Sequence, residues 1–223
     1  MIGGAMDDRG LWIAGTWGAA LLLWLGFRLF YDGLRRPLRP HEIETFLAGL
    51  GERMDATGND TARLRAFLEV DDGREFVMLN LVKTRPGVIT DPESGETLGG
   101  AEWLRRYSRT FVRGLIRRGG HPVFVGRKVG GYIDAWNSSA DPGWTLFGTM
   151  RYRSRRDLVR MAADPRFRAA HLNKTLGIEA TFSFPTQRQI AFYASPRVTV
   201  GLTLALAAAL AHILLLTFAW GTA

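Results

Sequence analysis

Two long apolar segments, one near each end of the chain, constrain the fold more than any other feature of the sequence. Leu11 to Phe30 holds a single charged residue, Arg28, and Val198 to Trp220 holds none. Twenty helical residues rise about 30 Å, which matches the hydrocarbon thickness of a bilayer. The sequence therefore predicts an integral membrane protein with transmembrane helices at residues 11–31 and 196–220.

Each span has an alternative that the sequence weakens. A cleaved signal peptide would explain the first segment, but a basic region before it is missing and the apolar run is too long. A buried helix of a water-soluble core would explain the second, but an uncharged run of this length is typical of a membrane span. Ser195 is a suitable N-cap for the second helix, with Pro196 in its first turn.

The basic residues beside the spans predict the orientation of the chain. Positive residues concentrate on the cytoplasmic side of a membrane protein. They follow the first span and precede the second: Arg28, Arg35, Arg36, Arg39, Arg188 and Arg197. We therefore expect an inner-membrane protein whose middle domain faces the cytoplasm, with the short tail of residues 1–10 and the C-terminus outside.

Small residues recur at four-residue spacing in both spans, where they would let helix backbones approach closely. They are Gly15 and Ala19 in the first span and Gly201, Ala205 and Ala209 in the second. His212 is the ionisable residue within the second span, and such a group usually has a partner. It could hydrogen-bond to another helix or ligate a haem iron or a chlorophyll-type magnesium, and both interpretations stay open.

The chain between the spans is charged and contains no cysteine, which excludes disulfides, thiolate metal sites and cysteine nucleophiles. The formal net charge of +8 suits a domain held beside anionic lipid. A nucleic-acid partner is not expected, because no recognisable reader motif accompanies the charge. The sequence also lacks a phosphate-binding loop, a dinucleotide fingerprint and the common hydrolase motifs.

The middle of the chain predicts a lead-in and one α+β domain. Residues 32–74 read as a basic linker with short helices, including one that Asp60 can cap. The period of the apolar residues then indicates the order β, α, β, β, α, β. The segments are strand Glu75–Lys83, a turn-rich loop at Thr84–Gly100, helix Ala101–Arg118, strands His121–Ile133 and Trp144–Tyr152, helices from Ser154 to Leu176, and strand Ile178–Phe184. Ser154 can cap the first of the later helices, and Asp164 can cap the next, which continues from Arg166 to Leu176.

This order is the ferredoxin-like, split βαβ arrangement, in which two helices cover one face of an antiparallel sheet. We place the domain at residues 75–187, followed by a linker at 188–195. Since the other face of the sheet must also be covered, we expect a homodimer or a place in a larger membrane complex.

Four arginines follow one side of the long helix at four-residue spacing: Arg105, Arg109, Arg113 and Arg117. Such a stripe is often only a solvated surface. In a membrane-bound protein it could also contact anionic lipid or an acidic partner.

Three segments of the middle domain carry a resemblance: Met78 to Lys83, Arg117 to Arg127, and above all Met150 to Gly177. They resemble a bacterial family of dimeric α/β-barrel proteins of unknown function. The resemblance covers about residues 76–184 and includes neither the spans nor the first helices. It implies the fold and carries no reaction with it.

The wider superfamily includes haem-degrading and cofactor-independent monooxygenases, which the chain resembles more loosely. That resemblance implies Asn80 on the first strand, Trp144 on a later strand and His171 on the second helix as candidate catalytic residues. His171 would ligate iron, Asn80 would steer bound oxygen and Trp144 would press on the macrocycle. Each of the three also suits a structural role in the core.

Polar groups near strand ends or on the core side of a helix are further ligand-binding candidates: Tyr107, His121, Arg151 and Arg153. None has the spacing of a nucleophile and its base. Three functions therefore remain. The chain is an accessory or ligand-binding subunit of a membrane complex, an oxygenase acting inside the barrel, or a module that binds anionic lipid. The first is favoured, so an enzyme is not expected, and no cofactor or metal is assigned.

Overall fold

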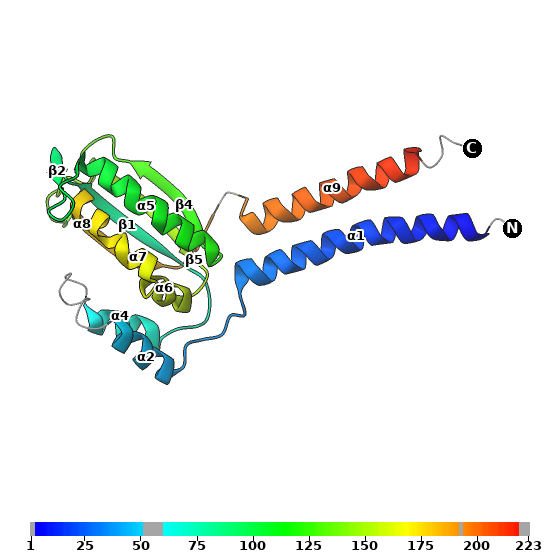
Figure 1. Cartoon of the computed structure of the whole chain (residues 1–223), viewed down its shortest axis with the longest axis horizontal. Coiled ribbons are helices and arrows are strands. Elements are labelled where there is room, and N and C mark those ends of the chain that lie inside the picture. Colours follow the sequence, from blue (N-terminus) through cyan, green and yellow to red (C-terminus); the bar gives the residue numbers. More distant parts are fainter. Residues whose placement is uncertain (1–2, 51–59, 192–193, 219–223) are drawn as a thin grey trace. The chain divides into compact units, whose positions relative to one another are not determined.

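The computed structural model describes residues 3–50, 60–191 and 194–218. They form two compact units (Figure 1). The paired-helix unit combines the two ends of the chain, residues 1–32 and 190–223, and the α+β unit comprises residues 33–189.

Two long helices form the paired-helix unit, α1 (Gly3–Asp32) and α9 (Pro196–Phe218). They run antiparallel, because Trp17 lies by His212 while Asp32 lies by Arg197. Within them, Gly10–Asp32 and Pro196–Phe218 are long and apolar enough to cross a membrane. As expected, the Ser195 carbonyl accepts the first backbone hydrogen bonds of α9.

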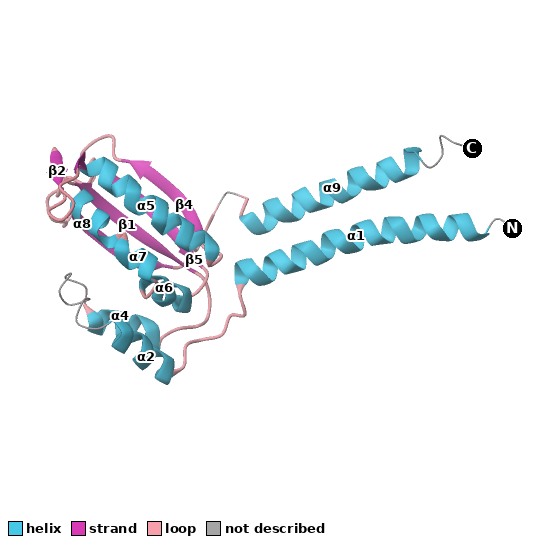
Figure 2. Ribbon diagram, in the orientation of Figure 1, coloured by secondary structure: helices cyan, strands magenta, loops and turns pink. Residues whose placement is uncertain are grey.

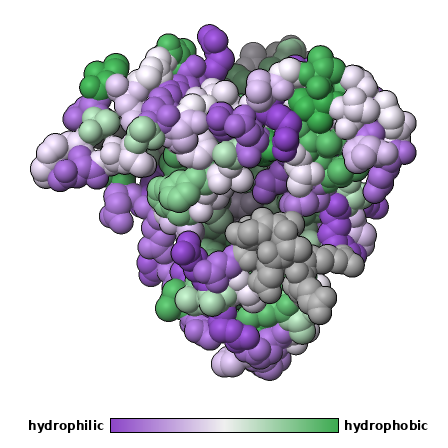
Figure 3. Space-filling view, turned by 90° about the vertical axis from the view of Figure 1, so that its left-hand side faces the viewer, coloured by the Kyte–Doolittle hydropathy of each residue, from purple (hydrophilic) through white to green (hydrophobic). Residues whose placement is uncertain are grey.

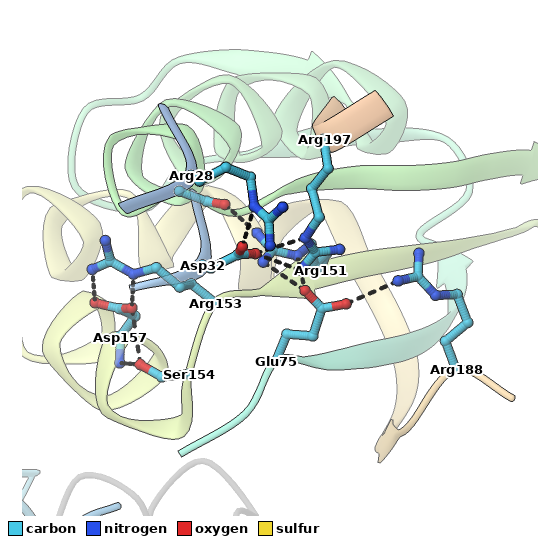
Figure 4. A network of polar contacts seen from close by, with 10 residues as sticks. Arg28, Asp32, Glu75, Arg151, Arg153, Ser154, Asp157, Arg188 and Arg197 are labelled. Carbon is cyan, nitrogen blue, oxygen red and sulfur yellow. Dashed lines mark hydrogen bonds and ion pairs between the residues drawn. The ribbon is translucent and has the colours of Figure 1, made fainter. Parts of the chain in front are cut away.

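An ionic cluster joins one end of this helix pair. Asp32 accepts hydrogen bonds from Arg28, one turn earlier in α1, at 2.6 Å and from Arg197 of α9 at 2.7 Å (Figure 4). The Arg197 guanidinium also lies 4.9 Å from the centre of the Tyr31 ring. The cluster connects the C-terminal turn of α1 to the N-terminal turn of α9.

The α+β unit contains a four-stranded antiparallel sheet in the order β4-β5-β1-β6. The strands are β1 (Phe76–Thr84), β4 (His121–Arg127), β5 (Leu146–Tyr152) and β6 (Ile178–Thr186). In the register, Asn80 lies opposite Gly148 of β5 and Ser183 of β6. The prediction of a mixed α+β domain with an antiparallel sheet is therefore confirmed (Figure 2).

Helices α5 (Gly100–Arg117), α6 (Arg155–Ala162), α7 (Pro165–Ala169) and α8 (His171–Gly177) lie along one face of this sheet (Figure 1). The caps expected from the sequence are present. Ser154 accepts from the Asp157 amide, Asp164 accepts from the Arg166 amide, and Asp60 caps α4 (Thr61–Glu69). Each cap satisfies backbone donors that the first helical turn leaves without a partner.

The core between sheet and helices gathers apolar side chains from both layers. Its buried members are Phe76, Leu115, Tyr152 and Met161, and Met78 and Met150 pack against them. The Phe76 and Tyr152 rings stack with centroids 5.0 Å apart. Since successive strand residues point to opposite faces, the even-numbered residues of β1 face the helices and the odd-numbered ones face away.

The lead-in segment packs onto the domain as a helical pair. Helices α2 (Pro40–Leu50) and α4 share a buried cluster with α6, made of Leu38, Ile43, Leu47, Leu68 and Val159. Asp71, just after α4, accepts a hydrogen bond from the Leu38 amide at 2.8 Å and lies 3.6 Å from Arg155 of α6. These residues are therefore part of the α+β unit.

Several element boundaries differ from the sequence prediction. The loop expected at Thr84–Gly100 contains a hairpin of β2 (Val88–Thr90) and β3 (Thr97–Gly99), joined by an Asp91 turn. β4 ends at Arg127 instead of Ile133, and the predicted strand from Trp144 begins at Leu146.

Seen from the side where β2 lies, hydrophobic residues are scattered among hydrophilic ones (Figure 3).

Candidate functional site

An ion-pair cluster lies at one end of the central strands. Arg151 of β5 is buried, and its guanidinium donates to Glu75 at 2.6 and 2.8 Å and to the Gly119 carbonyl. Arg188 donates to the other oxygen of Glu75 at 3.0 Å, so this carboxylate bridges two arginines (Figure 4). Glu75 could not be predicted as the partner of Arg151 from the sequence, because the two residues are 76 positions apart.

His121 lies opposite Arg151 in the strand register. Burial, together with the positive charges of Arg151 and Arg188, lowers the pKa of its imidazole. Its Nδ1 is 2.8 Å from the Pro122 carbonyl oxygen, which fixes the ring at the start of β4. Of the predicted ligand-binding residues, His121 and Arg151 are thus brought together, and both are engaged with neighbouring protein groups.

Arg153 lies in a second cluster at the start of α6. Its guanidinium makes two hydrogen bonds to Asp157, at 2.7 and 2.9 Å, and Ser154 donates to the same carboxylate at 2.9 Å (Figure 4). Asp157 is buried, so this arrangement compensates a buried charge and completes the helix cap. Gly33, the first residue of the unit, packs so closely on Arg153 that a Cβ atom there would lie 3.0 Å from its Cδ.

Tyr107 faces the core from α5. Its ring lies 5.8 Å from that of Phe111 and 5.9 Å from that of Phe167. Burial raises the pKa of Tyr107 and of Tyr152, and the two phenols are close enough for Tyr107 to raise the pKa of Tyr152 further. Both phenols are therefore neutral at physiological pH.

The three oxygenase candidates occupy different environments. Asn80 donates to the carbonyls of Met78 and Gly148 and accepts from Ser183 at 2.8 Å, so its amide joins neighbouring strands. Trp144 lies in the loop just before β5. His171 begins the short helix α8, where burial and the charge of Lys174 lower the pKa of its imidazole. Within the described residues, no hydrogen bond or ring contact joins these three side chains.

Between Arg151 at one end and Lys83 at the other, the sheet face that points away from the helices is largely apolar. Odd-numbered residues of β1 lie beside Phe147 of β5 and beside Phe182 and Phe184 of β6, and Phe124 of β4 lies opposite Thr149 of β5 on the same face. Phe124, Phe182 and Phe184 are 58%, 54% and 41% exposed. We call this surface the open sheet face. Aromatic side chains gathered in this way are typical of a protein contact surface.

The four predicted arginines of α5 are all exposed, so their stripe faces solvent. Arg105 pairs with Glu102. Among the described residues, no acidic partner lies within ion-pair distance of Arg109, Arg113 or Arg117.

In the paired-helix unit, the partner of His212 is a tryptophan. Trp17 of α1 donates from its indole nitrogen to Nδ1 of His212 over a long 3.4 Å. Gly201 lies against Trp24, where a Cβ atom would be 2.9 Å from the indole nitrogen. Ala205 lines a groove of about 210 Å³ between the helices, together with Gly201 and both tryptophans.

The remaining small residues of the predicted packing stripes lie differently. A Cβ atom at Gly15 would meet no atom within 4 Å, and Ala19 is exposed. Ala209 is half-buried, while its neighbour Ala208 is the most deeply buried described residue of α9. Within the described helix pair, the α1 stripe is therefore on the outer surface.

No protein-family model matches the chain, and no curated protein matches it. Two solved structures are similar to part of it. One is of a protein of unknown function from Rhodopseudomonas palustris, and the other is of the methylated form of that protein. Each is 25% identical with a TM-score of 0.48, covering 58% and 59% of this chain and 92% and 91% of its own. Their descriptions name no activity.

Proposed function

We propose that this chain is a membrane-anchored module of the ferredoxin-like, dimeric α/β-barrel type, which serves as an accessory subunit of a membrane complex. The strand order β4-β5-β1-β6, with two helical connections on one face, supports the ferredoxin-like topology. The α1 and α9 helices, each long and apolar enough to cross a bilayer, support the anchor. The basic residues flanking these helices support a cytoplasmic domain with both termini outside.

The observation that carries the proposal is the open sheet face. Three of its phenylalanines are between 41% and 58% exposed. With about 200 Å² for a whole aromatic side chain, they present on the order of 300 Å² of aromatic surface to solvent. This area is comparable with the largest apolar patch of a typical monomeric protein, and a patch of that kind often marks a contact site. In this type of domain, a second sheet laid face to face would cover it, and the occupant we propose is a second copy of this chain.

The polar side chains favour a binding or structural role over catalysis. Asn80 is engaged on both sides of its amide by neighbouring strands. Arg151 and Arg153 each form paired hydrogen bonds with a carboxylate. Groups bound to one another in this way stabilise a fold, whereas an acid or base in catalysis needs access to a reacting atom.

Charged substitutions on the open sheet face test the pairing. We would replace Phe182 and Phe184 together by Glu in the full chain, reconstitute it in nanodiscs, and count copies per particle by mass photometry. The matched control replaces Val88, which is 73% exposed on β2, by Glu. We expect pairs for the wild type and the control and single copies for the double variant, since a buried carboxylate without a partner is costly. Pairs that persist in the double variant would contradict the proposed interface.

A further inference from the structure

Six arginines on the outer side of the helix layer lie outside ion-pair distance of every acidic group that the structure describes. They are Arg109, Arg113 and Arg117 of α5, Arg160 of α6, and Arg166 and Arg168 of α7. All six are exposed, and in the part of the chain that the structure describes none forms an ion pair. We call this set the basic helix surface. Arg105, Arg106 and Arg118, on the same helix or at its end, are instead paired with Glu102, Glu96 and Asp164.

The charge of the protein is concentrated in these helices. Helices α5, α6 and α7 contain ten arginines and two acidic residues, Glu102 and Asp157. Their balance of +8 equals the formal net charge of the whole chain. Four of the ten arginines pair with acidic residues: Arg105 with Glu102, Arg106 with Glu96, Arg155 with Asp71 and Arg156 with Glu42. The other six are the basic helix surface.

The fold brings together arginines that are far apart in the sequence. Arg118, at the end of α5, donates to Asp164, the N-cap of α7, at 2.9 Å. Leu115 and Met161 belong to one buried cluster, which packs α5 against α6. The arginine stripe recognised in the sequence is therefore only part of a larger surface that includes residues about 50 positions later.

The Arg117 end of this surface lies at the end of the sheet where the chain leaves for both apolar helices, because Gly120, just after α5, packs against the Arg151 carbonyl of β5. β5 ends beside the start of α6, and Gly33, the residue after α1, packs on Arg153 there. β6 ends at Thr186, opposite Val77 at the same end of β1. Only residues 187–195 separate β6 from α9, a segment that spans at most about 30 Å. A domain on connections this short stays close to the bilayer that holds the helices.

We propose that the basic helix surface binds the headgroups of anionic phospholipids in the bilayer that anchors the chain. This inference rests on the proposed membrane anchor. The arginine fork suits phosphate oxygens, and basic residues close to a charged leaflet are attracted to it. The exposed positions of the surface are not interleaved with aromatic side chains, which a single-stranded nucleic acid would need for stacking. Anionic lipid is the occupant favoured by the positive charge of the surface and by the short connections to the two apolar helices.

The absence of cysteine allows a direct test. Ala169, exposed on α7, is replaced by Cys, labelled with a donor fluorophore, and the full chain is reconstituted in nanodiscs. Energy transfer to a headgroup-labelled lipid is compared between phosphatidylcholine alone and phosphatidylcholine with phosphatidylglycerol. The test variant combines Arg113→Gln, Arg117→Gln and Arg166→Gln, and the control combines Arg63→Gln, Arg85→Gln and Arg127→Gln, which are exposed elsewhere.

We expect phosphatidylglycerol to increase energy transfer for the wild type and the control, and added salt to reverse the increase. The test variant should lower the ratio of docked to undocked domain roughly 100-fold, since each basic residue near an anionic surface contributes about a factor of five. Equal transfer with both lipids, or a test variant that behaves like the control, would overturn the inference. The inference would also be overturned if phosphatidylglycerol did not change energy transfer for the wild type and these arginines instead bound an acidic polypeptide or RNA. Failure of the chain to enter nanodiscs would instead contradict the anchor.

Discussion

Replacing Leu68 by Ala is expected to destabilise the whole α+β unit. Leu68 is completely buried, at 0% exposure, in the cluster that joins α2 and α4 to Val159 of α6. A Leu→Ala change at such a site costs about 2–5 kcal/mol, because the lost burial and the remaining cavity add. Around 3 kcal/mol corresponds to a fall in Tm of roughly 6–12 °C for a unit of this size.

Scanning calorimetry of the full chain in mild detergent measures this effect. The control is Val70→Ala, at the end of the same helix, where the side chain is 69% exposed and the Tm should move by less than about 2 °C. A Leu68→Ala transition unchanged in Tm would refute the reasoning. So would two separate transitions, because residues 40–69 would then unfold independently of the sheet.

Three further outcomes follow from local geometry. Burial lowers the pKa of His121 and His171, so the fold favours their neutral forms. Their contribution to the free energy of unfolding should be complete above the unfolded pKa of about 6.5 and should decrease as the pH falls below about 6.5. Denaturant titrations should show a weaker pH dependence for a variant with Gln at both positions. Gly177→Ala would put a Cβ atom 2.5 Å from a backbone nitrogen of α5 and should lower the calorimetric Tm by several degrees; an unchanged Tm would mean that α8 is not packed this closely. Trp17→Phe removes the hydrogen bond to His212 and should weaken the helix pair by only about 0.6 kcal/mol in steric-trapping measurements, whereas complete separation of the helices would show that the bond contributes far more.

Local signals in the sequence predicted much of the fold. Asp60, Ser154 and Asp164 cap helices as expected, because a cap depends on residues within three positions of one another. The helix expected at Ala101–Arg118 is α5, ended by Arg118 and the glycines that follow. A short, nearly continuous apolar run likewise predicted the central strand β1.

Features that depend on distant contacts could not be predicted in the same way. The packing of α2 and α4 on α6 joins Leu68 to Val159, and short amphipathic helices alone do not reveal their partner. The tertiary fold also forms two ion pairs between distant residues, Glu75–Arg151 and Arg118–Asp164. The second of these pairs brings α5 next to α7. A helix predicted as continuous from Arg166 to Leu176 is divided into α7 and α8 around Ala170, which is buried.

The same distinction applies to the candidate sites. The sequence identified His212 as a group in need of a partner, but only the fold pairs it with Trp17. The α5 stripe was visible in the sequence, whereas Arg160, Arg166 and Arg168 join it only in the folded unit. The oxygenase candidates rest on a resemblance alone, and the hydrogen bonds of Asn80 assign that side chain a role between strands.

Native mass spectrometry of the full chain, released gently from its own membrane in mild detergent, tests the central claim most directly. The account predicts that the chain remains in the membrane fraction after an alkaline wash and is released as a particle with at least two copies, alone or with stoichiometric membrane subunits. A chain that the wash removes, or one released as a solitary single copy, would contradict a membrane-anchored module that pairs through its open sheet face.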